Sequence, residues 1–175
     1  MTGAPPPAAV PRMKTLLIVY HSMTGGTLQM ASAAAAGAAR EPALRVRLLH
    51  APEAQPADVL DAAGYLFATP ENLAGICGLM KDFFDRCYYP ALEQINGRPY
   101  ASLVCAGSDG QGAVRQIDRI AAGLRLRAVA PALIVCTHAQ TPEAIAQAKK
   151  IAAPDLERCT ALGAALAAGL ALGIY

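Results

Sequence analysis

A turn rich in hydroxyl groups and glycines follows the first apolar segment and has the residue types that can hold a phosphate monoester. It comes after residues 14–20 and His21, and its residues are Ser22, Met23, Thr24, Gly25, Gly26 and Thr27. Glycines let the backbone approach an anion, hydroxyls donate hydrogen bonds to it, and a following helix adds partial positive charge. The turn contains no lysine or arginine. This favours a phosphate that is held rather than transferred.

Other phosphate and redox motifs are missing from residues 21–27. A nucleoside triphosphate loop needs G-x-x-x-x-G-K-[ST], and a dinucleotide site needs G-x-G-x-x-G. A thiol phosphatase needs a nucleophilic cysteine in the loop. None of these patterns occurs in the turn. These absences narrow the expected ligand to a small molecule that carries a phosphate monoester.

Composition limits the classes of partner. The 175 residues are 54% hydrophobic and 16% charged, with a formal net charge of +2, which suits one α/β domain and gives no electrostatic case for nucleic acid. The cysteines form no C-x-x-C pair and lie near no histidine at ligand spacing, so we expect neither a metal site nor dithiol chemistry. Instead, we expect core or helix-face thiols in a reducing cytoplasm at Cys77, Cys87, Cys105, Cys136 and Cys159.

The residues at the two ends of the chain bear on its domain organisation and on membrane insertion. Residues 1–12 are rich in proline and lack the apolar segment of a signal peptide, which predicts a disordered leader before a single domain at 13–175. Translation from Met1 or from Met13 remains open. The apolar residues 161–175 are too few to span a bilayer. We expect a helix there that covers the sheet or a subunit interface, no membrane insertion, a cytoplasmic protein, and a homodimer as one option.

Apolar segments alternate with helical patterns along the chain, which predicts a doubly wound parallel sheet. Expected strands are residues 14–20, 44–49, 64–68, 100–106 and 131–136. Expected helices are residues 27–40, 76–89, 113–124 and 155–172, with a short one at 142–150. The fold class is therefore α/β, with three layers and a five-stranded parallel sheet of order 2-1-3-4-5.

Ligands of such sheets bind at the carboxyl ends of the strands, where this order brings three loops to one edge. The first is the turn at Ser22–Thr27. The second begins with Thr69, Pro70, Glu71, Asn72 and Leu73, and the third with Gly107, Ser108, Asp109 and Gly110. Two alternatives stay open: the glycines serve only the turns, and Glu71 and Asp109 only cap loops.

The turn at Ser22–Thr27 resembles the S/T-x-T-G-x-T phosphate loop of flavodoxin-like proteins. Residues 64–86, GYLFATPENLAGICGLMKDFFDR, resemble the corresponding segment of the NAD(P)H-dependent FMN reductase and quinone reductase branch, and the resemblance covers about residues 14–172. It implies an FMN whose phosphate is held by Ser22, Met23, Thr24, Gly25, Gly26 and Thr27. It also implies that the flavin ring is flanked by Thr69, Pro70, Glu71, Asn72, Leu73, Gly107, Ser108, Asp109 and Gly110.

The resemblance implies an oxidoreductase that passes reducing equivalents from NAD(P)H to a small acceptor such as a quinone or free flavin. The flavin carries out the chemistry, so we expect no catalytic side chain. The chain has no tryptophan, and neither ring loop contains an aromatic residue. An uncovered ring face leaves room for a second planar molecule, which favours a reductase over a flavodoxin-type one-electron carrier. The carrier and a flavin-free interaction domain of the same fold are the alternatives.

Overall fold

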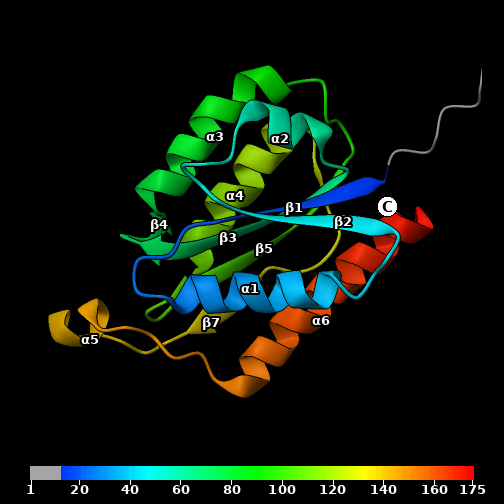
Figure 1. Cartoon of the computed structure of the whole chain (residues 1–175). Coiled ribbons are helices and arrows are strands. Elements are labelled where there is room, and N and C mark those ends of the chain that lie inside the picture. The colour runs from blue at the N-terminus through cyan, green and yellow to red at the C-terminus, as the bar shows by residue number, and fades with distance from the viewer. Residues whose placement is uncertain (1–12) are drawn as a thin grey trace, which may run out of the picture.

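A twisted sheet lies between two layers of helices (Figure 1). The computed structural model describes residues 13–175, so the leader expected at 1–12 lies outside the described residues. The parallel strands are β1 (Lys14–Tyr20), β2 (Leu44–His50), β3 (Gly64–Asn72), β5 (Pro99–Ala106), β6 (Arg127–Ala128) and β7 (Leu133–Cys136). A short antiparallel strand, β4 (Gly75–Ile76), pairs with the end of β3.

The order of the strands confirms the expected topology. The sheet runs β2-β1-β3-β5-β6, and β7 also pairs with β5. Tyr100 on β5 pairs with Ala128 on β6, whereas Leu103 farther along β5 pairs with Leu133 on β7. The two short strands therefore form one interrupted fifth strand. This is the 2-1-3-4-5 order predicted from the alternation of apolar segments and helices.

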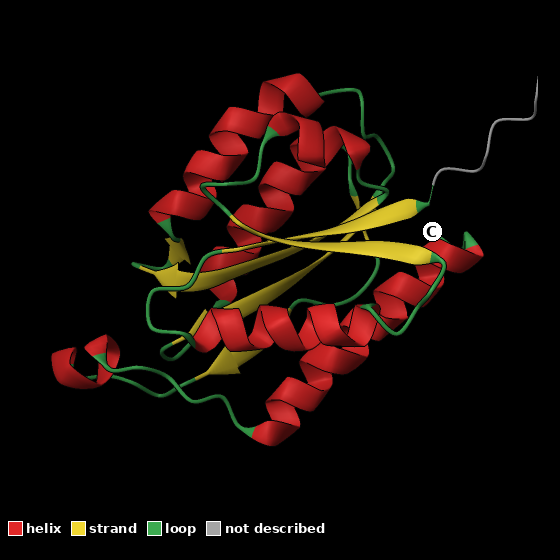
Figure 2. Ribbon diagram, in the orientation of Figure 1, coloured by secondary structure: helices red, strands yellow, loops and turns green. Residues whose placement is uncertain are grey.

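The helices cover both faces of the sheet (Figure 2). One face carries α1 (Gly26–Ala38) and α6 (Ala153–Leu172), and the other carries α2 (Pro56–Asp61), α3 (Gly78–Ala91) and α4 (Gln111–Gly123). Because side chains alternate along a strand, Leu16 and Ile18 of β1 pack toward α1 and α6, whereas Leu17 and Val19 pack on the opposite face. The short α5 (Pro142–Ala146) projects away from both layers in Figure 1.

Helices α1 and α6 pack with their backbones in close contact. A Cβ atom on Gly37 of α1 would lie 2.0 Å from the carbonyl oxygen of Thr160. A Cβ atom on Gly163 of α6 would lie 1.9 Å from the carbonyl oxygen of Ala34. Both distances are far below van der Waals contact, so this crossing requires glycine on each helix.

The main difference from the predicted elements is at the end of β3. The sequence predicts a loop for residues 69–72, but β3 continues through them to Asn72 and pairs with β4. The two residues between these strands, Leu73 and Ala74, have φ values of 50° and 60°. A two-residue hairpin turn usually takes glycine or asparagine at such positions, so its sequence signal is missing here. The short elements α2 and β6 are also absent from the prediction.

The helix expected near the C-terminus is present: residues 161–172 belong to α6, which covers the sheet. Across residues 13–175 we find no helix long and apolar enough to cross a membrane. All five cysteines are free thiols. Cys136 is partly exposed, and the other four are buried.

Candidate functional site

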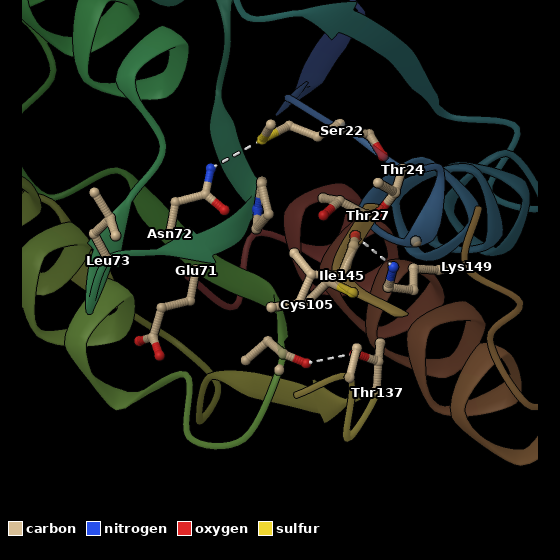
Figure 3. A pocket seen from close by; sticks show the side chains of 16 residues that line it. Ser22, Thr24, Thr27, Glu71, Asn72, Leu73, Cys105, Thr137, Ile145 and Lys149 are labelled. Carbon is tan, nitrogen blue, oxygen red and sulfur yellow. Dashed lines mark hydrogen bonds between the residues drawn. The ribbon is translucent and has the colours of Figure 1, made fainter. Parts of the chain in front are cut away.

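A pocket of about 490 Å³ lies at the carboxyl ends of the parallel strands (Figure 3). Its volume falls in the range of small-molecule sites. Residues from all three predicted loops line it, and so do residues from the connection between β7 and α6. The convergence expected from the strand order is therefore present in the structure.

The turn after β1 is shaped by its own polar groups. Gly25 has a φ of 86°, a conformation that favours glycine, and its N–H donates to the hydroxyl of Ser22 at 3.1 Å. Helix α1 starts at Gly26, and the N–H groups of its first turn have no partner inside the helix. Thr24, Gly26 and Thr27 line the pocket. This end of the pocket thus offers hydroxyls and backbone N–H groups beside the positive end of a helix.

Close packing behind this turn explains its second glycine. A Cβ atom on Gly26 would lie 2.7 Å from the Sγ atom of Cys105 on β5 and 3.3 Å from the Cβ atom of Lys149. Cys105 lines the pocket, and burial raises the pKa of its thiol. The thiol therefore stays protonated at neutral pH, and Gly26 lets α1 start directly against β5.

The hairpin formed by β3 and β4 makes a second wall. Pro70, Glu71, Asn72 and Leu73 line the pocket, and the amide nitrogen of Asn72 lies 3.1 Å from the sulfur of Met23. This contact links the first two loops across one side of the pocket. The side chains of Met23 and Leu73 are exposed at its edge.

Glu71 joins the second loop to the third. Its carboxylate accepts hydrogen bonds from the backbone N–H groups of Gly110 at 2.9 Å and Ala113 at 3.0 Å. Both N–H groups belong to the start of α4, whose N-cap, Gly110, has a φ of 85°. The structure thus shows the capping contact that the sequence left open for Glu71, and Glu71 also lines the pocket. The same cap holds the hairpin against α4.

The structure places most of the predicted residues around the pocket. Those that line it are Ser22, Met23, Thr24, Gly26, Thr27, Pro70, Glu71, Asn72, Leu73 and Gly107. Those outside the lining are Gly25, Thr69, Ser108, Asp109 and Gly110. Thr69 is fully buried, and its hydroxyl donates to the carbonyl of Pro70 at 2.9 Å and lies 3.4 Å from the sulfur of Cys77. Gly25 and Gly110 instead shape the turns that precede α1 and α4.

Sequence reasoning missed several residues of the lining. They are Cys105, Ala106, Thr137, Ala139, Ile145 and Lys149. Most of these belong to the segment that runs from β7 through α5 back toward α6. Its path is set by tertiary contacts, including a hydrogen bond of 2.7 Å from the N–H of Lys149 to the carbonyl of Thr24. No local motif in residues 137–150 signals this return.

A pair of histidines lies next to the turn at Ser22–Thr27. His21 Nδ1 and His50 Nε2 are 2.9 Å apart and share a hydrogen bond, with the rings stacked. Burial, and secondarily the charge of His50, lower the pKa of His21. Neither histidine lines the pocket. Residues 13–175 contain no group of three or more His, Cys, Asp or Glu side chains placed to hold a metal ion.

This sheet order defines a doubly wound α/β domain, and its pocket has a glycine- and hydroxyl-rich turn at the first strand-to-helix crossover. The family model described as Flavodoxin matches residues 18–150. The chain belongs to the flavodoxin family.

The relatives of this chain include a protein named flavodoxin and proteins named as dehydrogenases. A flavodoxin from Aquifex aeolicus is 34% identical over 100 residues, which cover 57% of this chain and 54% of that protein. An NAD(P)H dehydrogenase (quinone) from Acidithiobacillus ferrooxidans is 31% identical over 94 residues, covering 42% of this chain and 47% of the relative. The matched region spans about half the length of these relatives.

Solved structures support the fold. A flavodoxin from the domain Archaea superposes with a TM-score of 0.74 at 18% identity, and the match covers 89% of this chain and 98% of the other. A flavodoxin described as a WrbA-like protein from Agrobacterium tumefaciens has a TM-score of 0.67 at 19% identity, with 90% and 97% covered. At these identities the likeness shows the shared architecture.

Proposed function

We propose that this protein binds FMN and passes reducing equivalents from NAD(P)H to a small acceptor such as a quinone or free flavin. The observation that carries the proposal is the chemistry of the pocket wall. Hydroxyls and first-turn N–H groups lie at one end, and among the described residues no aromatic side chain lines the pocket. The resemblance of residues 64–86 to the reductase branch supports the same function.

The residues present fit FMN. Ser22, Thr24 and Thr27 bring hydroxyls to the start of α1, where a phosphate monoester gains hydrogen bonds and the helix dipole. The backbone of β3 from Pro70 onward, together with Gly107, provides N–H and carbonyl groups for a polar heterocyclic edge. Bound FMN supplies the redox chemistry. The residues of this chain hold it, orient it and keep water from part of its surface.

The lack of an aromatic side chain in the described lining favours the reductase over the carrier. Hydride transfer needs the donor and acceptor atoms at roughly 3–3.5 Å, so a nicotinamide or quinone has to lie parallel to the flavin. A stacked aromatic side chain would occupy that space. The exposed aliphatic side chains of Met23 and Leu73 at the edge of the pocket leave it open.

A one-electron carrier is the second candidate. The relative from Aquifex aeolicus, named a flavodoxin, has the higher identity and coverage of the two curated relatives described here. The two candidates differ in the source of their electrons. A reductase accepts them directly from NAD(P)H, whereas a carrier needs a partner reductase.

Absorption spectroscopy and stopped-flow mixing test the proposal. The purified full chain, incubated with FMN and desalted, should retain the visible flavin spectrum. Anaerobic mixing with NADPH or NADH should then bleach it directly. Bleaching that needs an added partner reductase would assign the carrier function. A protein that stays colourless after incubation would point to a flavin-free interaction domain.

Two glycine substitutions test where the phosphate is held. Gly25→Ala strains a residue whose φ is 86° in the turn before α1, so FMN affinity should fall about tenfold or more. Gly78→Ala is the matched control, because an added Cβ meets no atom within 4 Å there and φ is not positive. Equal FMN affinity in the two variants would contradict this placement of the phosphate.

A further inference from the structure

Lys149 is distant in sequence from the turn at Ser22–Thr27 but contacts it in the structure. Its backbone N–H donates to the carbonyl of Thr24 at 2.7 Å, and its own carbonyl accepts from the side chain of Gln29 at 2.7 Å. The same Gln29 amide nitrogen donates to the carbonyl of Gly25 at 3.0 Å, and its oxygen accepts from the N–H of Ile151. Gln29 therefore clamps Lys149 against the turn, and the position of the lysine backbone is fixed.

The ammonium group is also held in place. It donates to three carbonyls near the end of α5, those of Ala144 at 2.8 Å, Ile145 at 2.8 Å and Gln147 at 2.6 Å. Figure 3 shows the side chain of Lys149 among those that line the pocket. These three bonds fix the direction of the side chain, so the cation is oriented before any ligand enters.

The charge of Lys149 acts on the floor of the pocket. Burial raises the pKa of the Cys105 thiol, and the positive charge of Lys149 opposes that increase. Cys105 is the same residue whose sulfur packs behind Gly26. The field of the ammonium therefore extends to the start of α1, where the proposed phosphate is held.

Among the described residues that line the pocket, Lys149 is the only one with a cationic side chain. The one carboxylate in that lining, Glu71, is engaged with the N–H groups of Gly110 and Ala113 at the start of α4. A phosphate dianion in the turn thus shares the pocket with one cation whose position is fixed. In a partly buried site such an interaction is screened less than on the surface.

We propose that Lys149 supplies the countercharge for the phosphate monoester and so makes the site prefer FMN over riboflavin. This inference rests on the proposed binding of FMN. It moves part of the phosphate recognition from the turn itself to a lysine that lies 120 positions after Gln29 in the sequence and contacts it directly. The turn has no cationic residue, and the segment between α5 and α6 then supplies the positive charge through Lys149.

The alternative is that Lys149 only pins α5. None of the α5 residues is buried, so the ammonium bonds and the Thr141 cap contribute much of what holds this short helix. If Lys149 only holds α5 in place, its loss would displace Ile145 and weaken the binding of FMN and of riboflavin equally. If Lys149 supplies a countercharge, its loss would weaken the binding of FMN alone, because riboflavin has no phosphate. The ratio of the two affinities therefore separates the roles.

The experiment titrates FMN and riboflavin into the full chain and follows the quenching of flavin fluorescence. Lys149→Gln removes the charge but keeps an amide donor for the α5 carbonyls, and Lys149→Arg keeps the charge. Lys150→Gln is the matched control, because Lys150 is exposed and lies outside the lining of this pocket. We expect Lys149→Gln to lower FMN affinity roughly tenfold or more while riboflavin affinity stays unchanged.

The outcomes distinguish this inference from the proposed function. An unchanged ratio of FMN to riboflavin affinity in Lys149→Gln, with FMN still bound by the wild type, would overturn the role of Lys149 alone. A wild type that binds neither flavin would overturn the proposed function and this inference with it. If Lys149→Gln does not fold, the affinities of the wild type for FMN and riboflavin are measured at increasing salt concentration instead. With a countercharge, only the affinity for FMN should fall markedly as salt rises. Equal salt dependence for the two flavins would then overturn the countercharge.

Discussion

The carboxylate of Glu71 lies 2.9 Å from the backbone nitrogen of Gly110 and accepts its hydrogen bond. Glu71 is on β3 and Gly110 precedes α4, so one side chain joins two of the three loops around the pocket. A second bond, from the N–H of Ala113, completes the cap at the start of α4.

Removal of this cap should destabilise the protein. We expect Glu71→Ala to lower the free energy of unfolding by about 1–2 kcal/mol, because two N–H groups at the start of α4 lose their acceptor. Glu71→Gln keeps one acceptor oxygen and should have a smaller effect. Urea denaturation measures both, with Glu157→Ala on the exposed part of α6 as the control. Equal values for Glu71→Ala and this control would contradict the capping role.

The turn between β3 and β4 should gain stability from residues suited to its backbone. Leu73 and Ala74 have φ values of 50° and 60°, and the side chain of Leu73 is fully exposed. Asparagine and glycine tolerate such φ values better than leucine and alanine do. The double substitution Leu73→Asn, Ala74→Gly should therefore raise the free energy of unfolding by about 1 kcal/mol.

The control for this turn is a glycine substitution where φ is negative. Ala36→Gly, at an exposed position inside α1, should lower the free energy of unfolding by about 1 kcal/mol. Thermal or urea denaturation of each variant gives the comparison. A loss of stability in the Leu73→Asn, Ala74→Gly variant would show that the turn is not strained.

The regular elements could be predicted because their signals are local. The apolar run of residues 14–20 and the helical spacing of residues 76–89 each act within one element, and the structure confirms β1 and, with shifted ends, α3. The hairpin at Leu73 and Ala74 could not be predicted, since its residues carry no turn signal. It forms because Glu71 and the Gln116 side chain, which accepts from the N–H of Ile76, hold it against α4.

The candidate site could be predicted only where it follows strands. The turn at Ser22–Thr27 has residue types that point to an anion on their own, and most of them line the pocket. Lys149 and Ile145 reach the pocket through contacts between distant segments, such as the bond between Lys149 and Thr24. Periodicity and spacing contain no information about such a return, so this part needs the structure.

The stability of the fold should fall as the pH drops below about 6.5. Burial and the charge of His50 lower the pKa of His21 below its usual 6.5 in the folded state. His21 therefore binds a proton more readily in the unfolded chain than in the folded one. Its contribution to the free energy of unfolding is fully present above pH 6.5 and decreases as the pH falls toward the lower pKa of His21 in the folded state. Urea denaturation between about pH 8 and pH 5 measures this, and His21→Gln should flatten the dependence. An equally steep dependence in His21→Gln would assign it to other groups.

The packing between Gly26 and Cys105 should appear as coupling between two substitutions. Gly26→Ala places a Cβ atom 2.7 Å from the Cys105 sulfur and should cost about 1–3 kcal/mol of stability. Adding Cys105→Ala removes that sulfur and should restore part of the loss. A double-mutant cycle from urea denaturation measures the interaction. Strictly additive effects would contradict a direct contact.

The glycine crossing of α1 and α6 has a consequence for the other end of α1. Gly37 lies eleven residues after Gly26, which corresponds to about 16 Å along a helix. Because Gly37 and Gly163 bring the two backbones into contact, they help to set the orientation of α1. The direction of its first N–H groups toward an incoming anion thus depends partly on packing at the other end of the helix.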